Sequence, residues 1–538
     1  MVAEKDQVAM YTLTLPAGQS SESVASMTES LDAKANHPEN DVTSLTEESG
    51  VQQDKSQALD FLHLLGDGRR RTQTPIESLY GYVFRPDMLS LLAGLPHHST
   101  FVFRSLKVTV PKMGQGMQRA IPMDESVATQ EIDIPFFPAV GANPTECSIA
   151  LKNSMQYGVT RGIKGFLDFA REHIQYMHDP PYADWDVIAT IGNTDALAKA
   201  ISLIGSPGDY LLVDEWTYPA AVDTARSHDV WCAPVLMDTL GMLPSKLDQL
   251  LSNWTQEYPG KPQPKMMYLV PTGQNPTGVT MPLHRRQAIY QLAQKHNLII
   301  FEDDPYYYMQ YASYHPPQER QSNETDRQPG LNNLIPSFLS LDTDGRVIRM
   351  DTFSKILAPG TRAGWITANA QFVRYIEYHN ETTIQQPAGF SQAAITELLT
   401  NVWGHQGWIR FLKQLQFDYY HRRNIYVDML QKHLEGMVEY IIPNAGMFVW
   451  LKLLLPSHRL MPKNPDQSIM EELFHAFVEA KVVVMPGFYF VGDRGNKASG
   501  QQPFLRTAFS CTDVKDFEPA VERMAQVLQE YECGKSRT

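Results

Sequence analysis

Cysteine is scarce in this chain of 538 residues. The four cysteines are Cys147, Cys232, Cys511 and Cys533, and they lie too far apart for the paired spacing of metal-binding cysteines. So few and so widely scattered cysteines exclude a disulfide framework and fit a reducing compartment. We therefore predict a cytoplasmic location and no metal site.

Long apolar runs are also absent, since no stretch of about 18 apolar residues suggests a transmembrane helix. Hydrophobic residues make up 43% of the chain and are spread over a length that can bury more than one core. We expect a large soluble protein without a membrane partner.

An excess of positive charge is lacking as well. The net charge is −14, and residues 1–60 contribute −8 of it, with eleven acidic and three basic residues. Because nucleic acids bind basic surfaces, we expect no nucleic-acid partner. The same segment is rich in Ser, Thr and Gln, without periodicity and without the basic start of a signal or transit peptide. We predict a disordered tail there, with a docking segment as the alternative.

Strand-like and helix-like patterns alternate between about residues 150 and 370, and Gln287–Lys295 is typical of the helix-like segments. The alternation predicts an α/β fold: a mostly parallel sheet covered by helices, with a ligand site at the carboxyl ends of the strands. The apolar runs expected to be strands are 186–191, 210–214, 230–237, 266–270, 298–302 and 347–350.

The segment Val347–Lys355 ends a strand-like run at a lysine beside two hydroxyl residues, Thr352 and Ser354, and Arg362 follows seven residues later. A lysine forms a Schiff base with an aldehyde only when burial or nearby positive charge lowers its pKa. Arg362 can supply that charge and can bind a phosphate together with the two hydroxyls. This arrangement is typical of an enzyme that uses pyridoxal phosphate (PLP).

Two other strand-like runs also end in polar residues. One ends in the turn that contains Asn275, whose amide can donate a hydrogen bond to a phenolate oxygen. The other ends in Glu302, Asp303 and Asp304, and a carboxylate in such a place can keep a pyridine nitrogen protonated. We assign that role to Asp304 and expect Glu302 and Asp303 to be solvated loop acids.

The motifs at residues 275–278, 302–307, 341–355 and 504–510 resemble those of fold-type-I PLP-dependent aminotransferases. The similarity is greatest to the aromatic and α-aminoadipate/kynurenine group, particularly its fungal branch, and runs from about Arg69 to about Glu530. It implies a large PLP-binding domain and a smaller α+β domain. The expected divisions are a tail at 1–60, an amino-terminal arm with part of the small domain at 61–135, the large domain at 136–370 and the rest of the small domain at 371–535.

The resemblance implies roles for particular residues. Lys355 would carry the cofactor as a Schiff base, and Asp304 would pair with its protonated ring nitrogen. Asn275 and Tyr307 would bond the ring hydroxyl. Arg506 would bind the α-carboxylate of the substrate as a bidentate pair.

Further residues complete the expected site. Asn193 and Thr194 open a helix-like segment, and a helix amino terminus is a natural phosphate site. By resemblance, Tyr218 would stack on the cofactor ring and Gly94 would belong to a substrate-binding loop. Tyr157 would reach the phosphate of a second subunit, which implies a homodimer with shared active sites.

The chain also departs from the family pattern. Trp216 stands where relatives tend to have proline, and residues 313–330 form a polar insertion rich in loop-forming residues. These differences leave the cofactor chemistry intact and leave the substrate open.

We therefore predict an aminotransferase that moves the amino group of phenylalanine, tyrosine or tryptophan to 2-oxoglutarate, with Lys355 as general base. α-Aminoadipate, kynurenine or a substrate of specialised metabolism are alternatives, as is a PLP-dependent C–S lyase. Related domains in transcription regulators carry a DNA-binding segment, for which the acidic amino-terminal region is unsuited.

Overall fold

In a computed structural model, the described residues are 55–75, 77, 79, 89, 91–92, 94–112, 128–137, 149–320, 328–455, 468–493 and 503–532. Most of the expected acidic tail, residues 1–54, lies outside them. Residues 55–60 belong to the folded unit, because the backbone amide of Leu59 donates to the carbonyl of Asp344 (2.8 Å) and that of Ala58 donates to the Asp184 carboxylate (2.7 Å).

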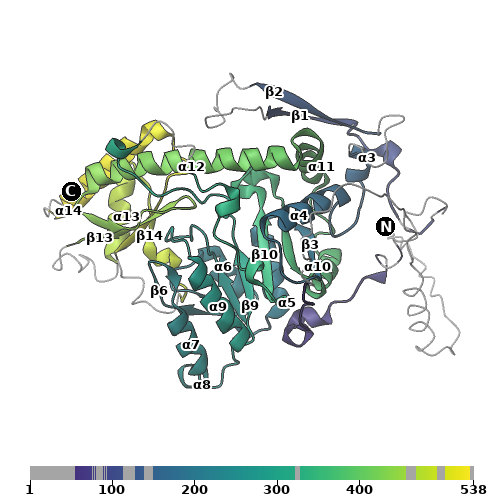
Figure 1. The fold of residues 1–538 in the computed structure, drawn as a ribbon, viewed down its shortest axis with the longest axis horizontal. Helices are drawn as coiled ribbons and strands as arrows, with labels where there is room; N and C mark the ends of the chain where they lie inside the picture. Colours follow the sequence, from purple (N-terminus) through teal and green to yellow (C-terminus); the bar gives the residue numbers. More distant parts are fainter. Residues whose placement is uncertain are drawn as a thin grey trace, which may run out of the picture. The chain divides into compact units, whose positions relative to one another are not determined.

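The centre of the molecule is a seven-stranded sheet with the strand order β3-β11-β10-β9-β8-β4-β5 (Figure 1). Neighbouring strands run parallel from β10 to β5, and β11 runs antiparallel to both of its neighbours. All six apolar runs expected to be strands are strands of this sheet. The strands are β3 Trp185–Thr190, β4 Tyr210–Asp214, β5 Trp231–Val235, β8 Met266–Leu269, β9 Ile299–Asp303, β10 Val347–Thr352 and β11 Gly364–Asn369.

Helices cover both faces of the sheet, because the strands are apolar on both sides. One face is covered by α5 Asn193–Ile204, α6 Pro219–Ser227 and α10 Ala370–Thr382. The other is covered by α4 Lys164–Met177, α7 Pro244–Ser252, α9 Leu283–Lys295 and α11 Gly389–Glu397. The short helices α3 Leu151–Ser154 and α8 Trp254–Glu257 and the strand pair β6 Met237–Asp238 and β7 Gly241–Met242 are peripheral.

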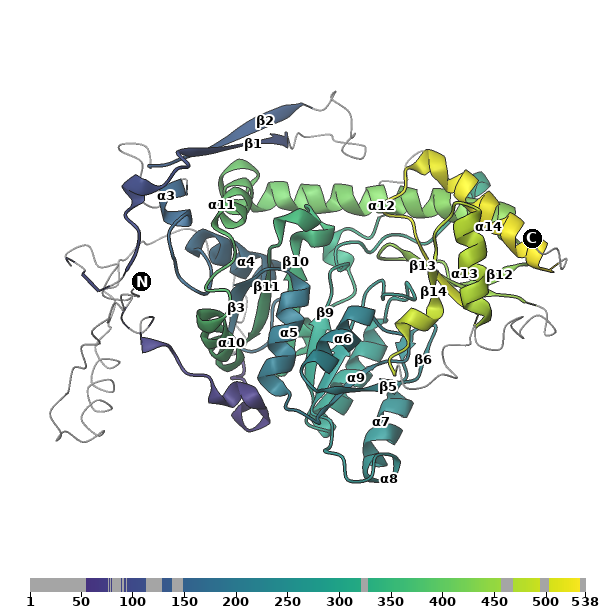
Figure 2. The ribbon, with the colours of Figure 1, turned by 180° about the vertical axis from the view of Figure 1, so that it is seen from behind.

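A second, antiparallel sheet has the strand order β12-β13-β15-β14 and its own apolar core with α12, α13 and α14 (Figure 2). The helix α12 is 31 residues long, and its side chains enter the core of the large sheet at Trp408 and that of the small sheet at Leu430. It thereby joins the two sheets. The elements are α12 Gly404–Leu434, β12 Val438–Tyr440, β13 Phe448–Leu453, α13 Ile469–Glu479, β14 Met485–Pro486, β15 Phe504–Ala508 and α14 Phe517–Glu532.

Two parts of the chain pack differently from the expected domain division. Helix α10 was expected to open the small domain, but Phe372 and Ile376 are buried in the core of the large sheet. The hairpin of β1 Ser105–Pro111 and β2 Thr129–Pro135 lies in the range expected to form the amino-terminal arm and part of the small domain, and it contacts α11. The reason is that its apolar side chains, such as Ile132 and Ile134, join the large core.

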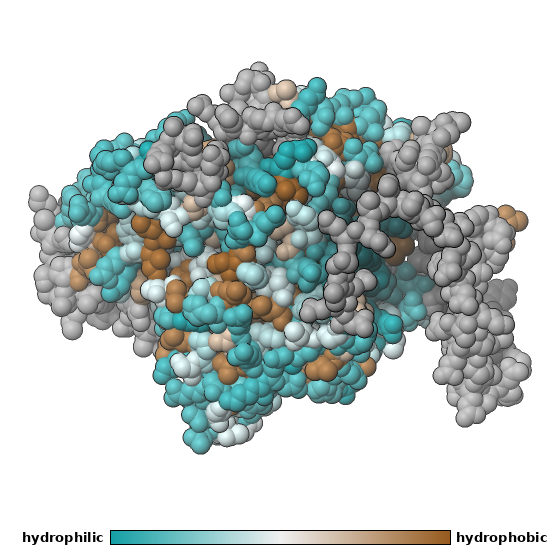
Figure 3. Space-filling model, viewed as in Figure 1, coloured by the Kyte–Doolittle hydropathy of each residue, from teal (hydrophilic) through white to brown (hydrophobic). Residues whose placement is uncertain are grey.

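Residues 313–320 and 328–330 are the described part of the insertion, and Tyr314 and Arg320 connect it to α12. Arg320 donates two hydrogen bonds to the Asp428 carboxylate (2.6 and 2.8 Å), and the Tyr314 hydroxyl donates to the same carboxylate (2.8 Å). In the described part of the chain, no helix is long and apolar enough to cross a membrane. The face shown in Figure 3 is mainly hydrophilic, with apolar groups scattered over it, some of them over the region of β13, β14 and α13.

Candidate active site

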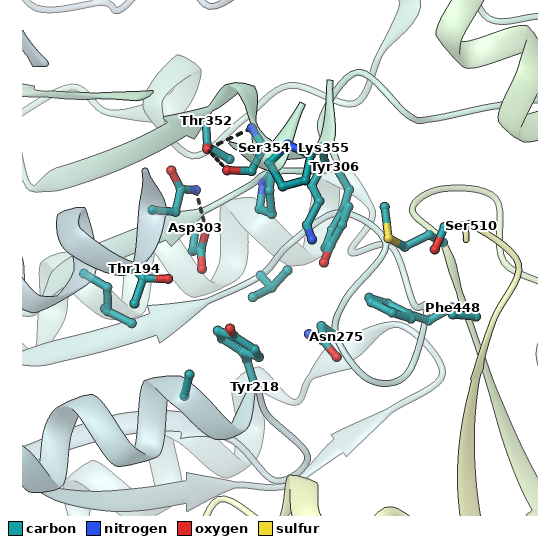
Figure 4. Close-up of a pocket in the computed structure, with 18 of the residues that line it drawn as sticks. Thr194, Tyr218, Asn275, Asp303, Tyr306, Thr352, Ser354, Lys355, Phe448 and Ser510 are labelled. Carbon is teal, nitrogen blue, oxygen red and sulfur yellow. Dashed lines mark hydrogen bonds between the residues drawn. The ribbon is translucent and has the colours of Figure 1, made fainter. Parts of the chain in front are cut away.

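A cavity of about 430 Å³ lies at the carboxyl ends of the large-sheet strands and is closed on one side by the small sheet (Figure 4). Nine residues predicted from the sequence line it: Asn193, Thr194, Tyr218, Asn275, Thr352, Ser354, Lys355, Arg362 and Arg506. The alternation of strands and helices explains this convergence, since parallel strands deliver the residues that follow them to one edge.

Lys355 reaches the cavity from the 3-10 turn Phe353–Lys355 that follows β10. The hydroxyl of Thr352 accepts a hydrogen bond from the backbone amide of Ser354 (3.1 Å) and so caps this turn. Burial lowers the pKa of Lys355, the nearby cations Arg506 and Arg362 lower it further, and Asp303 opposes them. The amine is therefore neutral over a wider pH range than that of an ordinary lysine, as a nucleophile or a general base requires.

A second corner of the cavity is suited to an anion. The backbone of Arg362 adopts a left-handed conformation (φ 45°), and its guanidinium donates to the Ile191 carbonyl (2.9 Å) and the Ser354 hydroxyl (3.3 Å). A side chain at Gly192 would bring a Cβ to 2.8 Å from this guanidinium, so glycine leaves it room. The amino terminus of α5, with Thr194, opens at the same place, where free backbone N–H groups favour an anion.

Asp303 presents a buried carboxylate to the cavity. It accepts hydrogen bonds from the Asn193 amide (2.6 Å) and the Tyr268 hydroxyl (2.7 Å), which hold it in one orientation. Burial raises its pKa, and these two donors, together with Arg349 and Lys355, counteract the rise. Tyr268 was not anticipated from the sequence, because a tyrosine in the middle of an apolar strand is indistinguishable from a core residue there.

Asp304 and Tyr307 do not line this cavity, contrary to the expectation from the sequence. The Asp304 carboxylate accepts a hydrogen bond from Thr272 (3.0 Å) and lies 3.7 Å from Arg349, and the Tyr307 ring packs under the Arg349 guanidinium (4.8 Å). Asp303 and Tyr306 line the cavity in their place.

Glu302 and Asp303 are not solvated loop acids either. Glu302 is fully buried and forms an ion pair with Arg349 (3.2 Å), and Asp303 is buried at the cavity wall. The strand β9 continues through both residues, so they are part of the sheet interior and not of a loop.

Arg506 projects from β15 on the side of the cavity formed by the small sheet. Its guanidinium lies between the rings of Phe448 (4.4 Å) and Phe490 (4.9 Å), and it donates to the side-chain oxygen of Asn275 (2.9 Å). Burial lowers its pKa, an effect that Tyr306 and Tyr218 partly oppose. Its Nε is buried and has no hydrogen-bond partner among the described residues, so the guanidinium can still bind an anion.

Tyr218 immediately precedes α6, and its side chain enters the cavity between those of Asp303 and Asn275 in the view of Figure 4. Burial raises the pKa of this tyrosine, and the carboxylate of Asp303 adds to the rise. The hydroxyl therefore stays protonated, and the ring is free to stack on a planar ligand.

Gly94 and Tyr157 do not reach this cavity within one chain. They line a second cavity of about 540 Å³, together with Thr74, Glu381 and Gln385. The Tyr157 side chain is 53% exposed, so it is available to contact another molecule.

Comparisons with known proteins agree on the family. The sequence profile described as aminotransferase class I and II matches residues 138–524. An aromatic amino acid aminotransferase of Schizosaccharomyces pombe is 36% identical over 89% of this chain and 98% of its own length. An L-tyrosine:2-oxoglutarate aminotransferase of Serpula lacrymans is 32% identical over 80% of this chain and 83% of its own length. The crystal structure of the aminotransferase Aro8 of Candida albicans superposes with a TM-score of 0.79 at 31% identity, covering 89% of this chain and all of that one.

Proposed function

The chain belongs to the class I and II aminotransferases, and we propose that it transfers the amino group of an aromatic L-amino acid to 2-oxoglutarate. The observation that carries the proposal is one cavity that holds a lysine with a lowered pKa, a buried carboxylate and an arginine at its rim: Lys355, Asp303 and Arg506. These are the three charged groups that amino-group transfer through PLP needs: one to bind the cofactor, one to protonate its ring and one to hold the substrate carboxylate.

The cavity residues fit PLP. Asp303 would pair with the ring nitrogen, because two donors already fix its carboxylate toward the cavity. Asn275 and Tyr306 would bond the ring oxygen, and Tyr218 would stack on the ring. Asp303 and Tyr306 thus take the roles expected of Asp304 and Tyr307. When bound, PLP supplies an electron sink for the negative charge that develops at the substrate α-carbon.

The anion corner would hold the phosphate. Thr194 and Ser354 offer hydroxyl donors, Arg362 offers a charged fork, and the first backbone amides of α5, beginning at Asn193, offer N–H donors. The hydroxyl of Thr352 bonds that of Ser354 (2.8 Å) and so orients it.

Lys355 acts as the general base. Its neutral Nζ removes the proton from the substrate α-carbon, and the nearby cations Arg506 and Arg362 disfavour the ammonium form, so that the proton is given up again. Arg506 holds the substrate carboxylate with two parallel hydrogen bonds, which turns the α-carbon toward the lysine. Phe448 and Tyr306 supply apolar surface beside it for an aromatic side chain.

The aromatic donor class is supported by the names of the relatives. Three proteins of Schizosaccharomyces pombe are described as aromatic amino acid aminotransferases, and those of Serpula lacrymans and Tapinella panuoides as L-tyrosine:2-oxoglutarate aminotransferases. A bovine kynurenine/alpha-aminoadipate aminotransferase is 29% identical over 82% of this chain, which keeps that substrate pair as the second candidate.

The test is the visible absorption spectrum of the purified holoenzyme during sequential addition of phenylalanine and 2-oxoglutarate. We expect the absorbance of the bound cofactor to fall with phenylalanine and to recover with 2-oxoglutarate, and Lys355→Ala to show neither change. A spectrum that responds to α-aminoadipate or kynurenine and not to phenylalanine would overturn the aromatic assignment. Release of pyruvate from a cysteine conjugate without an oxoacid acceptor would indicate a C–S lyase.

The proposal includes a cytoplasmic homodimer in which Tyr157 and the loop of Gly94 complete the active site of the partner subunit. The homodimer is supported by eight exposed apolar side chains between residues 89 and 159, since their burial against a partner subunit would be favourable. They are Leu89, Leu91, Leu92, Val102, Phe103, Phe137, Tyr157 and Val159.

Complementation between variants tests the shared site. Lys355→Ala and Tyr157→Ala chains should each be inactive or weak alone, and mixed dimers should regain activity because one of their two sites is intact. Absence of recovery in verified mixed dimers, or a monomeric mass by light scattering, would contradict the proposal.

A further inference from the structure

Trp216 links the large sheet to the small one beside the active site. It lies in the connection from β4 to α6, two residues before Tyr218, and only 6% of it is exposed. Its indole contacts the rings of Trp450 (centroids 5.4 Å apart) and Phe504 (5.3 Å) on the small sheet. Trp450 in turn packs edge-on against Phe490 (5.7 Å). These four side chains form an aromatic cluster distinct from the cores of the two sheets.

The aromatic cluster surrounds the part of the small sheet that carries Arg506. Trp450 on β13 is the residue paired with Arg506 across the two strands, and Phe504 lies two residues before Arg506 on the same strand. Phe490 is itself one of the two rings that enclose the Arg506 guanidinium (4.9 Å). Movement of the cluster would therefore move the guanidinium.

Backbone hydrogen bonds tie the same two regions together. Trp216 pairs with Val491 as an antiparallel bridge, the amide of Thr217 donates to the carbonyl of Phe490 (2.8 Å), and that of Gly492 donates to the carbonyl of Glu215 (3.0 Å). Two backbone segments that are far apart in sequence are thus locked in register directly beside Tyr218.

A third connection runs to Asn275. The side-chain amide of Gln274 donates to the carbonyl of Trp216 (2.6 Å), and the neighbouring residue, Asn275, accepts from Arg506 (2.9 Å). Three sets of contacts therefore connect Trp216 to residues of the cavity: Tyr218, Arg506 and Asn275.

We propose that Trp216 is a positioning residue that sets the distance between the cofactor-stacking Tyr218 and the carboxylate-binding Arg506. This inference rests on the proposed function. Its physical basis is that the α-carbon reacts only when the substrate carboxylate is held within a fraction of an ångström of the right place, and an arginine on a separate sheet needs a rigid brace to hold it there. The indole fills that space between the sheets with ring contacts, each of which favours one geometry.

The direct test is Trp216→Leu in the holoenzyme. We expect KM for phenylalanine to rise about 10-fold and kcat to change less than about 3-fold, because the ring contacts that hold the carboxylate-binding side of the site are lost. Trp216→Phe should recover most of the wild-type KM. Phe504→Leu, which removes a contact of Trp216 from the small-sheet side, should raise KM in the same way even if Trp216→Leu does not fold.

Trp254→Leu is the matched control. Trp254 is also a buried tryptophan (1% exposed) that stacks on Tyr258 (4.1 Å), but it lies in the core of the large sheet and does not line the active-site cavity. Its loss should lower the melting temperature and leave KM within about 2-fold of the wild-type value. A KM that is unchanged in Trp216→Leu, with only a lower melting temperature as in the control, would overturn the proposal.

Ligand binding separates this proposal from the proposed function. 3-Phenylpropanoate carries the carboxylate and no amine, and 2-phenylethylamine carries the amine and no carboxylate; both are titrated into the holoenzyme and followed by its visible absorbance. Trp216→Leu should weaken 3-phenylpropanoate about 10-fold and 2-phenylethylamine less than about 2-fold. Equal weakening of both would contradict the inference. If the wild-type enzyme bound 3-phenylpropanoate in this Trp216-dependent manner but did not transaminate aromatic amino acids, the proposed function would fail and the positioning role would stand.

Discussion

Asp303 and Asp304 are adjacent in the chain and both are buried, yet their carboxylates have different surroundings. Asp303 faces the cavity and accepts hydrogen bonds from Tyr268 and Asn193. Asp304 accepts one hydrogen bond from Thr272 and lies near Arg349 on the other side of the sheet end. Burial raises the pKa of both groups. The two residues therefore offer a direct comparison between a carboxylate held for chemistry and one held for stability.

The alternation of side chains along β9 explains the difference. Ile299 and Phe301 belong to the core on the α5 side, and Ile300 belongs to the opposite core. Asp303 continues the first series and so reaches the cavity beside Tyr268, while Glu302 continues the second and meets Arg349. Successive polar residues at the end of a buried strand can thus lie on opposite faces of the sheet, one in the cavity and the next in a buried ion pair.

The largest expected effect is on catalysis, with Asp303→Asn. Asparagine keeps the shape but removes the charge that would hold a ring nitrogen protonated, so we expect kcat/KM to fall about 10³-fold, with a small change in melting temperature. Asp304→Asn is the matched control and should keep activity within about 3-fold. Steady-state kinetics and thermal melts of both variants test this prediction. A greater loss of activity in Asp304→Asn would show that Asp304, and not Asp303, is the carboxylate of the site.

Arg349→Met should affect stability instead. Arg349 is fully buried among three carboxylates, Glu302, Asp304 and Asp351, and its removal leaves buried negative charge unpaired. We expect the free energy of unfolding to fall by about 3 kcal/mol or more, measured by urea denaturation. Lys164→Met, which breaks an exposed ion pair with Asp168, should cost less than about 1 kcal/mol. Similar losses in the two variants would show that the buried cluster is not a main support of the fold.

Tyr268→Phe should produce an intermediate effect. It removes the hydroxyl that donates to Asp303 (2.7 Å) and leaves the ring, so we expect kcat/KM to fall about 10-fold, since a hydrogen bond to a charged group contributes about 1.5–3 kcal/mol. Tyr290→Phe is the control, because its hydroxyl bonds Asp342 and Asp344 outside the cavity. Equal kcat/KM values for the two variants would show that the Tyr268 hydroxyl has no role in the active site.

The smallest expected effect concerns Asp214, a buried carboxylate without an ion pair among the described residues. Burial raises its pKa to about 7, and a hydrogen bond from Gln274 opposes this rise. Well below pH 4 the group is protonated in both the folded and the unfolded state. As the pH rises from 4 to 7, the unfolded state loses this proton first, so the free energy of unfolding falls; above pH 7 the penalty is complete.

Asp214→Asn removes this penalty. The variant should be more stable than the wild type by about 1 kcal/mol or more at pH 8, with a difference that disappears toward pH 4. Denaturation at both pH values measures it. An advantage of equal size at pH 4 and pH 8 would show that Asp214 titrates normally in the folded protein.

Much of the fold and part of the site could be predicted from the sequence. The six apolar runs are strands because each is a local pattern of buried residues, and Lys355 and Arg362 lie together because one strand and one tight turn carry both. The sequence analysis expected Asp304 and Tyr307 in the cavity, whereas Asp303 and Tyr306 line it, and this difference has a definite reason. Tyr306 is the third residue after Asp303, just as Tyr307 is the third residue after Asp304, so spacing cannot distinguish the two pairs.

The sequence by itself determined the local chemistry: a strand followed by a lysine beside two hydroxyl residues, an arginine seven residues on, and the alternation that brings strand ends to one edge. Only the tertiary structure decided which acid and which tyrosine face the cavity, that Tyr268 orients the acid, and that Trp216 connects the loop of Tyr218 to the strand of Arg506. The physical reason is that a hydrogen bond or a ring contact depends on the distance and relative orientation of two groups. Residues far apart in the chain acquire that distance and orientation only when the sheets have packed.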